Sequence, residues 1–190
     1  IGVDSAGNFV IAWNDVRNTP GNQSPTQIYC QRLNRDGNFL GINFRIGQDT
    51  TYNPKITMLR DGRFVVSWVR IFGVSADSYE LYYQRFDRNG QSLTQPLRIV
   101  DTVYVYSSTG IKGLSIASDT TGKFIICWSR AHTFLSDPKV FFQRFDSSGV
   151  KLGGIDSVNE ANSNAEFPSV AMNYDGSFVA AWQDDRTAQY

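Results

Sequence analysis

The stretch Gly62-Arg63-Phe64-Val65-Val66-Ser67-Trp68 decides the fold, because the chain of 190 residues carries it four times. The other copies run over residues 7–13, 122–128 and 176–182, and each ends in a tryptophan. Consecutive tryptophans are 55, 60 and 54 residues apart, a period typical of one multi-stranded unit in a repeat protein. We predict equivalent buried positions, on the second strand of each unit, for all four tryptophans, which are Trp13, Trp68, Trp128 and Trp182.

A second block follows the first three copies, at residues 28–33, 81–86 and 140–145, and each block contains a Gln-Arg pair. A residue that recurs in every unit more often holds the unit together than performs chemistry that needs one site. We therefore assign a structural role to the three arginines of these pairs, which are Arg32, Arg85 and Arg144.

Both blocks are short, rich in β-branched and aromatic residues, and bounded by Gly, Asn or Asp, which is typical of strands. In the second unit we predict strands at residues 55–59, 63–69, 80–86 and 97–100. Glycines in the tight turns provide the positive φ that hairpins need. The chain is predicted to be all-β, with four-stranded antiparallel units and no helix.

The strand at residues 63–69 is apolar at almost every position, so both of its faces must be covered. Blades arranged radially in a β-propeller provide that cover, and a β-solenoid-like stack is the alternative. The predicted blade repeats are residues 1–52, which open late in a first strand, 53–112, 113–166, and a partial repeat at 167–190 with two strands.

The pattern Asp-Gly-x-Phe-Val-x-x-Trp-x-Asp-x-Arg, followed by Ile-Tyr-x-Gln-Arg-Phe-Asp-x-x-Gly, resembles the tandem repeats of large bacterial secreted and surface proteins predicted to form propellers. The resemblance covers the whole chain and implies export, an extracellular or cell-surface location, and a binding or adhesion role. It implies no shared catalytic residues. Repeats two and three depart from the pattern, because Arg70 and Arg130 stand where the outer repeats have Asp15 and Asp184.

Three full periods and two further strands are too few for a closed ring, since propellers typically have at least four blades. We expect further blades of a longer protein, or of another copy, to cover the ends. We expect Cys30 and Cys127 to be unpaired core thiols, because they lie on different strands of separate units.

The charge is balanced, with 18 basic and 18 acidic residues, which argues against nucleic-acid partners. Apolar runs are too short to span a bilayer, so no membrane insertion is expected. The sequence shows no catalytic constellation, cofactor motif or metal cluster. His132 is the single histidine, and the Asp-containing turns are interpreted as hairpin turns rather than calcium loops.

Asp15 and Arg17 follow the second strand of the first unit, where they form either a structural ion pair or a polar ligand site. Function is expected in the long connections between second and third strands and between units, since binding loops are usually carried on a rigid scaffold. These connections carry aromatic residues suited to a glycan or a protein surface. The aromatic residues are Tyr52, Phe72, Tyr79, Tyr104, Tyr106, Phe134 and Phe167, and the first six are the candidate binding residues.

The leading hypothesis is a non-enzymatic extracellular recognition or adhesion module that binds a glycan or protein. The first alternative is a glycan-active enzyme, a glycoside-hydrolase-like propeller that uses carboxylates. Adjacent carboxylates such as Asp184 and Asp185 would point to opposite faces of a strand. The second alternative is a structural spacer within a large surface protein.

Overall fold

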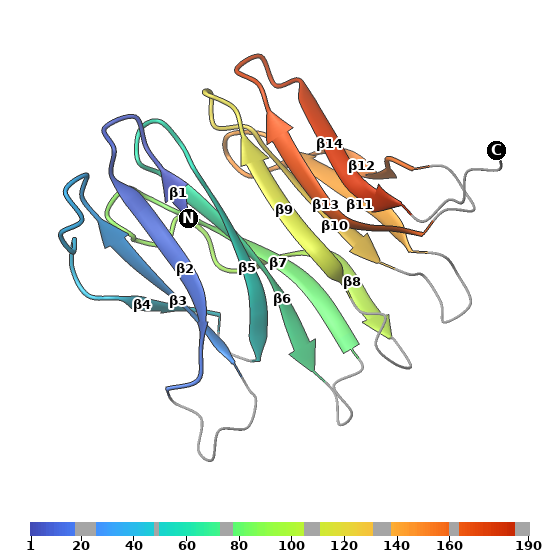
Figure 1. Cartoon of the computed structure of the whole chain (residues 1–190), viewed down its shortest axis with the longest axis horizontal. Helices are drawn as coiled ribbons and strands as arrows, with labels where there is room; N and C mark the ends of the chain where they lie inside the picture. Colours follow the sequence, from blue (N-terminus) through green and yellow to red (C-terminus); the bar gives the residue numbers. More distant parts are fainter. Residues whose placement is uncertain are drawn as a thin grey trace. The chain divides into compact units, whose positions relative to one another are not determined.

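A computed structural model describes residues 1–17, 26–47, 50–72, 78–104, 111–130, 138–159 and 164–184. Every regular element in these ranges is a β-strand (Figure 1). None of them includes a helix with the length and apolar character needed to cross a bilayer. The chain divides into two compact units, Ile1–Thr102 and Val103–Tyr190, which are described separately below.

The first unit contains two four-stranded antiparallel sheets. Sheet I runs in the order β1, β2, β3, β4 and sheet II in the order β5, β6, β7, β8. The bounds in sheet I are β1 Gly2–Val3, β2 Phe9–Asp15, β3 Gln27–Leu33 and β4 Phe44–Ile46. The bounds in sheet II are β5 Thr51–Met58, β6 Phe64–Phe72, β7 Ser78–Phe86 and β8 Leu97–Tyr104, whose last two residues belong to the second unit.

The second unit contains sheet III and a two-stranded hairpin. Sheet III is built from β9 Lys112–Ser118, β10 Phe124–Arg130, β11 Lys139–Phe145 and β12 Lys151–Ser157. The hairpin joins β13 Ala165–Met172 to β14 Phe178–Asp184. The prediction of an all-β chain with four-stranded antiparallel meanders is confirmed.

Sheets I and II pack face to face through one hydrophobic core. Val10, Ile28 and Cys30 of sheet I meet Phe64 and Trp68 of sheet II in this core. A second core joins sheet III to the hairpin, where Ile125 and Cys127 pack against Val170 and Phe178. The second strands of sheets II and III, β6 and β10, are therefore buried over most of their length, as their apolar sequences require.

All four tryptophans lie on the second strand of their sheet, but their burial differs. Trp68 and Trp128 are 2% and 0% exposed, whereas Trp13 and Trp182 are half-buried, so the prediction of uniform burial is wrong. The face of β2 that carries Trp13 is turned away from sheet II, whose contact is made by the alternate residues Val10 and Ala12.

Trp182 lacks a different neighbour. In sheets I, II and III the tryptophan pairs across the strand with Tyr29, Tyr82 or Phe141, whereas the β13–β14 hairpin has no third strand in the described part of the chain. One side of the Trp182 indole is therefore not covered by a third strand.

The predicted repeat boundaries at 52/53, 112/113 and 166/167 fall inside the first strand of each following sheet. The pairing register shifts at these places, between Tyr52 and Lys55 on β5 and between Glu166 and Ser169 on β13. Each shift contains a proline, a residue that in a sequence usually indicates a loop. The strand therefore begins before the proline, with a bulge where the sequence suggests a break.

The thiols of Cys30 and Cys127 are both free and buried. Burial raises the pKa of each thiol to about 12.

Candidate functional site

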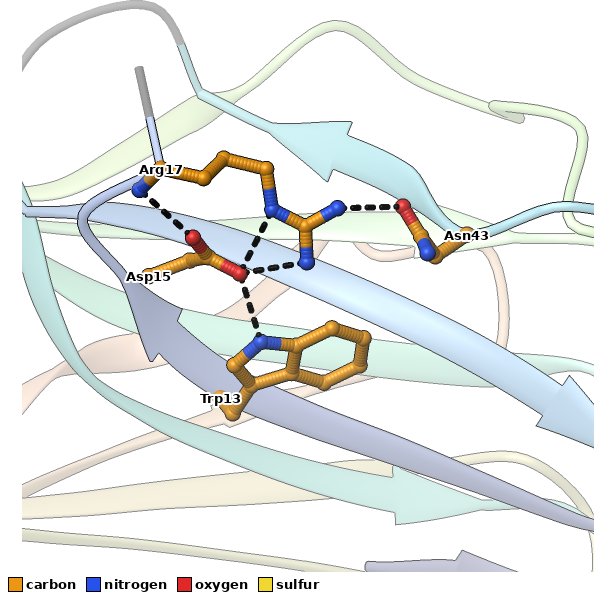
Figure 2. Close-up of polar contacts among 4 residues, drawn as sticks. All are labelled: Trp13, Asp15, Arg17 and Asn43. Atoms are coloured by element: carbon orange, nitrogen blue, oxygen red, sulfur yellow. Dashed lines mark hydrogen bonds and ion pairs between the residues drawn. The ribbon is translucent and has the colours of Figure 1, made fainter. Parts of the chain in front are cut away.

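The second and third strands of each sheet are joined at one end by the long connections of the sequence, and we call this the loop end. In sheet I the loop end carries Trp13, Asp15 and Arg17 (Figure 2). Trp13 and Asp15 are two residues apart on β2, so their side chains share a face. The Trp13 indole Nε1 donates to Asp15 Oδ2 at 2.9 Å, and Arg17 Nε donates to the same oxygen at 2.8 Å.

Arg17 completes this cluster with three further contacts. Its backbone N–H donates to Asp15 Oδ1 at 2.8 Å, and its Nη1 donates to Asn43 Oδ1 at 3.2 Å (Figure 2). The guanidinium lies 4.3 Å from the ring centre of Tyr29, which itself stacks on Trp13. The hydrogen bonds from Arg17 hold the pKa of Asp15 far below its usual value. Asp15 is therefore ionised at neutral pH, where its carboxylate accepts the hydrogen bonds of Trp13 and Arg17.

In sheet II the carboxylate comes from the neighbouring strand β7 and not from the second strand, β6. Glu80 pairs with Arg70 across β6 and β7, and Arg70 Nη1 donates to Glu80 Oε2 at 3.1 Å. Arg98 Nη1 donates to Oε1 at 2.7 Å and the Tyr82 hydroxyl to Oε2 at 2.9 Å. Burial alone would raise the pKa of Glu80, but these hydrogen bonds and the two arginine charges outweigh it, and the pKa is lowered.

The Glu80 cluster was not found by the sequence analysis. Its four members are spread over β6, β7 and β8, and only the antiparallel register brings them together. An acidic residue followed two positions later by Tyr was the one available signal.

Sheet III has no carboxylate at this position among its described residues. Arg130 pairs across the strand with Lys139, and its guanidinium lies 5.0 Å from the ring centre of Phe141. Trp128 Nε1 and Arg130 Nε are buried and have no hydrogen-bond partner among the residues that the structure describes. Burial lowers the pKa of Arg130. In the hairpin, Trp182 Nε1 donates to Asp184 Oδ2 at 3.3 Å, which repeats the first step of the sheet I cluster.

Two of the six candidate aromatic residues lie together. The rings of Tyr52 and Tyr79 meet edge to face, with centroids 6.4 Å apart. Burial, followed by the charge of Tyr79, raises the pKa of Tyr52. Phe72 and Tyr104 end β6 and β8 and are described by their backbone alone, and Tyr106 and Phe134 lie outside the described residues, as does His132.

Equivalent positions near the start of β5, β9 and β13 adopt positive φ. They are Asn53 at 55°, Gly113 at 74° and Phe167 at 52°. A phenylalanine rarely adopts this conformation, and such strain often marks a functional position. The Phe167 ring is 56% exposed.

Gly113 and Phe167 also touch. A Cβ on Gly113 would lie 2.6 Å from Phe167 Cα, so the two strand starts approach more closely than any other residue at position 113 would allow. The backbone of β9 therefore supports the unusual conformation of Phe167.

The opposite end of each sheet, which we call the turn end, carries the glycine hairpins. Arg32 Nη1 donates to the carbonyl oxygen of Asn89 at 2.6 Å, which ties β3 to a turn of sheet II. Arg144 is exposed and Arg85 is half-buried. The structural role of all three arginines stays a prediction.

The aspartates of the hairpin turns accept hydrogen bonds from backbone N–H groups of their own turns. Oδ1 of Asp87 accepts the backbone N–H groups of Asn89 and Gln91 at 2.8 Å, and Asp146 accepts those of Ser148 and Val150 in the same way. No group of three or more metal-ligating side chains occurs within the described ranges.

No protein-family model matches the chain, and no curated protein matches it. Solved structures share its fold. An endo-arabinase from Bacteroides thetaiotaomicron VPI-5482 matches over 93% of the chain and 66% of its own length, with 14% identity and a TM-score of 0.57. A protein of unknown function from Dyadobacter fermentans DSM 18053 matches over 97% of the chain and 60% of its own length, with 12% identity and a TM-score of 0.65.

A looser likeness, with a TM-score of 0.49 and 10% identity, is to an α-L-arabinofuranosidase from Lactobacillus brevis, over 96% of the chain and 63% of its own length. The chain thus spans less than two thirds of the length of each of these structures.

These likenesses correct the leading functional hypothesis. A non-enzymatic recognition or adhesion module was expected, whereas the fold is shared with an endo-arabinase. The sequence misled because repeats at fixed spacing are shared by adhesion proteins and enzymes alike.

Proposed function

We propose that the chain is part of a glycan-active enzyme of β-propeller architecture, acting on an arabinose-containing polysaccharide. The sheets are its blades, and further blades of a longer protein or another copy close the ring. The successive four-stranded meanders and the face-to-face packing within each unit support this architecture. The endo-arabinase likeness, over 93% of the chain, supports the substrate class. An enzyme of this kind would work outside the cell, where its polymer substrates lie.

The exposed ring of Phe167 is the observation that carries the proposal. Apolar C–H faces of sugars stack on aromatic rings, and a strained backbone that presents such a ring to solvent points to a ligand. Phe167 lies at the start of β13, at the loop end of its hairpin, and Gly113 supports it from behind.

The carboxylates at the loop ends have different roles. Asp15 and Glu80 have lowered pKa values and are held by arginines, so they do not suit the general acid that glycoside hydrolysis needs. Glu166 directly precedes Phe167 and is half-buried. We assign Glu166 a contact with the sugar bound at Phe167, and a partner carboxylate from a further blade would complete the catalytic pair.

The test measures binding and cleavage of arabinan by the protein and by Phe167→Ala, using release of reducing ends and affinity electrophoresis. The substitution should weaken both by about tenfold, the effect of losing one stacking contact. Phe167→Trp should keep them, since it retains an aromatic face. Tyr174→Ala is the matched control, because Tyr174 is 69% exposed on the same hairpin but lies in its turn.

Failure of the folded protein to bind or cleave any arabinose-containing polysaccharide would overturn the proposal. Equal activity of Phe167→Ala and the unaltered protein would overturn the assignment of Phe167.

A further inference from the structure

A cavity of about 350 Å³ opens at the turn end between sheets I and II, within the first unit. Its walls come from the β1–β2 turn with Asp4 and Asn8, from the β5–β6 turn with Arg60 and Asp61, and from the β7–β8 turn with Arg88. Cavities that bind small ligands begin at about 300 Å³. The space is therefore sufficient for one or two sugar rings.

Gly62 lets the walls come close. It adopts a φ of 87°, and a Cβ there would lie 3.1 Å from Arg88 Cβ and 3.4 Å from Asp4 Oδ2. A larger residue would fill the space between the turns of the two sheets.

The charge of the cavity is unbalanced in favour of arginine. Arg32, Arg60 and Arg88 line it. In the described part of the chain, the guanidinium groups of Arg60 and Arg88 make no ion pair, and Arg32 uses only Nη1, on backbone carbonyl oxygens. Five nitrogen-bound hydrogens on each guanidinium can be donated, so most of this capacity is unused.

The two carboxylates of the cavity are already bonded. Asp4 Oδ1 accepts the N–H groups of Ala6 at 2.9 Å and Asn8 at 2.8 Å, and Oδ2 accepts Asn8 Nδ2 at 2.9 Å. Asp61 Oδ2 accepts Arg63 Nε at 2.7 Å. The unmatched donors of the cavity therefore suit a ligand that brings its own negative charge.

The floor of the cavity is apolar, with side chains of Val10, Leu33, Leu40 and Met58. An apolar floor under a rim of guanidinium and amide groups is complementary to a sugar ring that carries a carboxylate. A free inorganic anion would use the rim and leave the floor bare.

We propose that this cavity binds a hexuronate residue, with its carboxylate on Arg60 and Arg88 and its ring over Leu40 and Met58. The site lies at the turn end, whereas the sugar contacts proposed for Phe167 lie at a loop end, so the two proposals stand or fall separately. An acidic residue of a mixed glycan bound here would anchor the protein on its polymer.

The experiment titrates the protein with digalacturonate, with the neutral disaccharide galactobiose and with inorganic phosphate, and measures binding by calorimetry. Digalacturonate should bind, galactobiose should bind at least about tenfold more weakly, and Arg88→Gln should reduce digalacturonate affinity by about tenfold. Arg60→Gln, on the second wall, should act in the same direction.

Arg35→Gln is the matched control. Arg35 occupies the position in the β3–β4 turn that Arg88 occupies in the β7–β8 turn, and it does not line the cavity. The control should leave affinity unchanged. Equal binding of phosphate and digalacturonate, or equal losses in Arg35→Gln and Arg88→Gln, would overturn the proposal, as would the absence of digalacturonate binding by the folded protein.

Discussion

The loop ends of sheets I and III carry a tryptophan at the same position but differ in net charge. In sheet I, Trp13 Nε1 and the Arg17 guanidinium both donate to Asp15, and the cluster is satisfied internally. In sheet III, Trp128 and Arg130 present the same two kinds of donor without an acceptor in the described residues, and Lys139 lies opposite Arg130. Three positions separate the neutral cluster from the cationic one, because Arg130 stands in place of Asp15, His132 in place of Arg17 and Lys139 in place of Gln27.

Sheet II shows a third solution to the same problem. Arg70 also replaces the aspartate, but Glu80 on the neighbouring strand restores the carboxylate. Sheets I and III both place a guanidinium group over an aromatic ring, and the residue that supplies the carboxylate differs between sheets I and II. The net charge at this position therefore depends on residues from more than one strand of the sheet.

The largest expected difference between the two sheets concerns the tryptophans. Trp128→Ala should lower the free energy of unfolding by about 3–5 kcal/mol, because it leaves a cavity in a buried site. Trp13→Ala should cost about 1–2 kcal/mol, since part of the side chain is already in contact with water. Urea denaturation of each variant measures both values. Equal losses would show that Trp13 is as buried in solution as Trp128, and would remove the distinction between the sheets.

The second test transfers the carboxylate of sheet II to sheet III. Lys139→Glu places an acid opposite Arg130, as Glu80 stands opposite Arg70, and should raise the free energy of unfolding by about 1 kcal/mol. Lys139→Gln is the control, since it removes the like-charge pair and adds no acceptor. A loss of stability in Lys139→Glu would indicate that an anion from outside the described residues already neutralises Arg130.

The third test removes the carboxylate of sheet I. Because the pKa of Asp15 is lowered in the folded protein, its contribution to stability is complete above the unfolded pKa, about 3.9. That contribution is lost as the pH falls through the folded pKa. Asp15→Asn should therefore lower the melting temperature at pH 7, and the difference from the unaltered protein should shrink below about pH 4. A difference that stays constant down to pH 2 would contradict the assigned ionisation.

The smallest effect is expected for the thiols. Cys30 in sheet I and Cys127 in sheet III are both buried with pKa values of about 12, so both should react with a disulfide reagent at pH 8 far more slowly than in the unfolded chain. The reaction is followed by absorbance, with and without urea. Faster labelling of one thiol without urea would show that its sheet opens locally more often.

Much of the fold could be predicted because strand and turn signals are local. The glycine turns, the apolar second strand and the Gln-Arg third strand recur along the chain. A strand that is assigned wrongly in one copy can therefore be recognised from the other copies. Asp15 and Arg17 could be singled out for the same reason. Their mutual hydrogen bond joins residues only two positions apart.

Residues brought together by pairing or by stacking of sheets could not be found in this way. Glu80 and Arg98 are 18 positions apart, and the arginine-lined cavity is assembled from four turns of two sheets. The positive φ of Phe167 also depends on its surroundings, because Gly113 of a neighbouring sheet makes room for it. Sequence periodicity reports which face of a strand is apolar, and it does not report which face a neighbouring sheet covers.

By itself, the sequence determined the number of strands in each sheet, their order and the equivalence of the four tryptophans, since these follow from short-range patterns that repeat. Tertiary structure alone decided which tryptophans are buried, which carboxylate each arginine meets and where a charged cavity forms. Burial and pairing depend on the surface that one sheet presents to another, and that surface combines residues from distant parts of the chain.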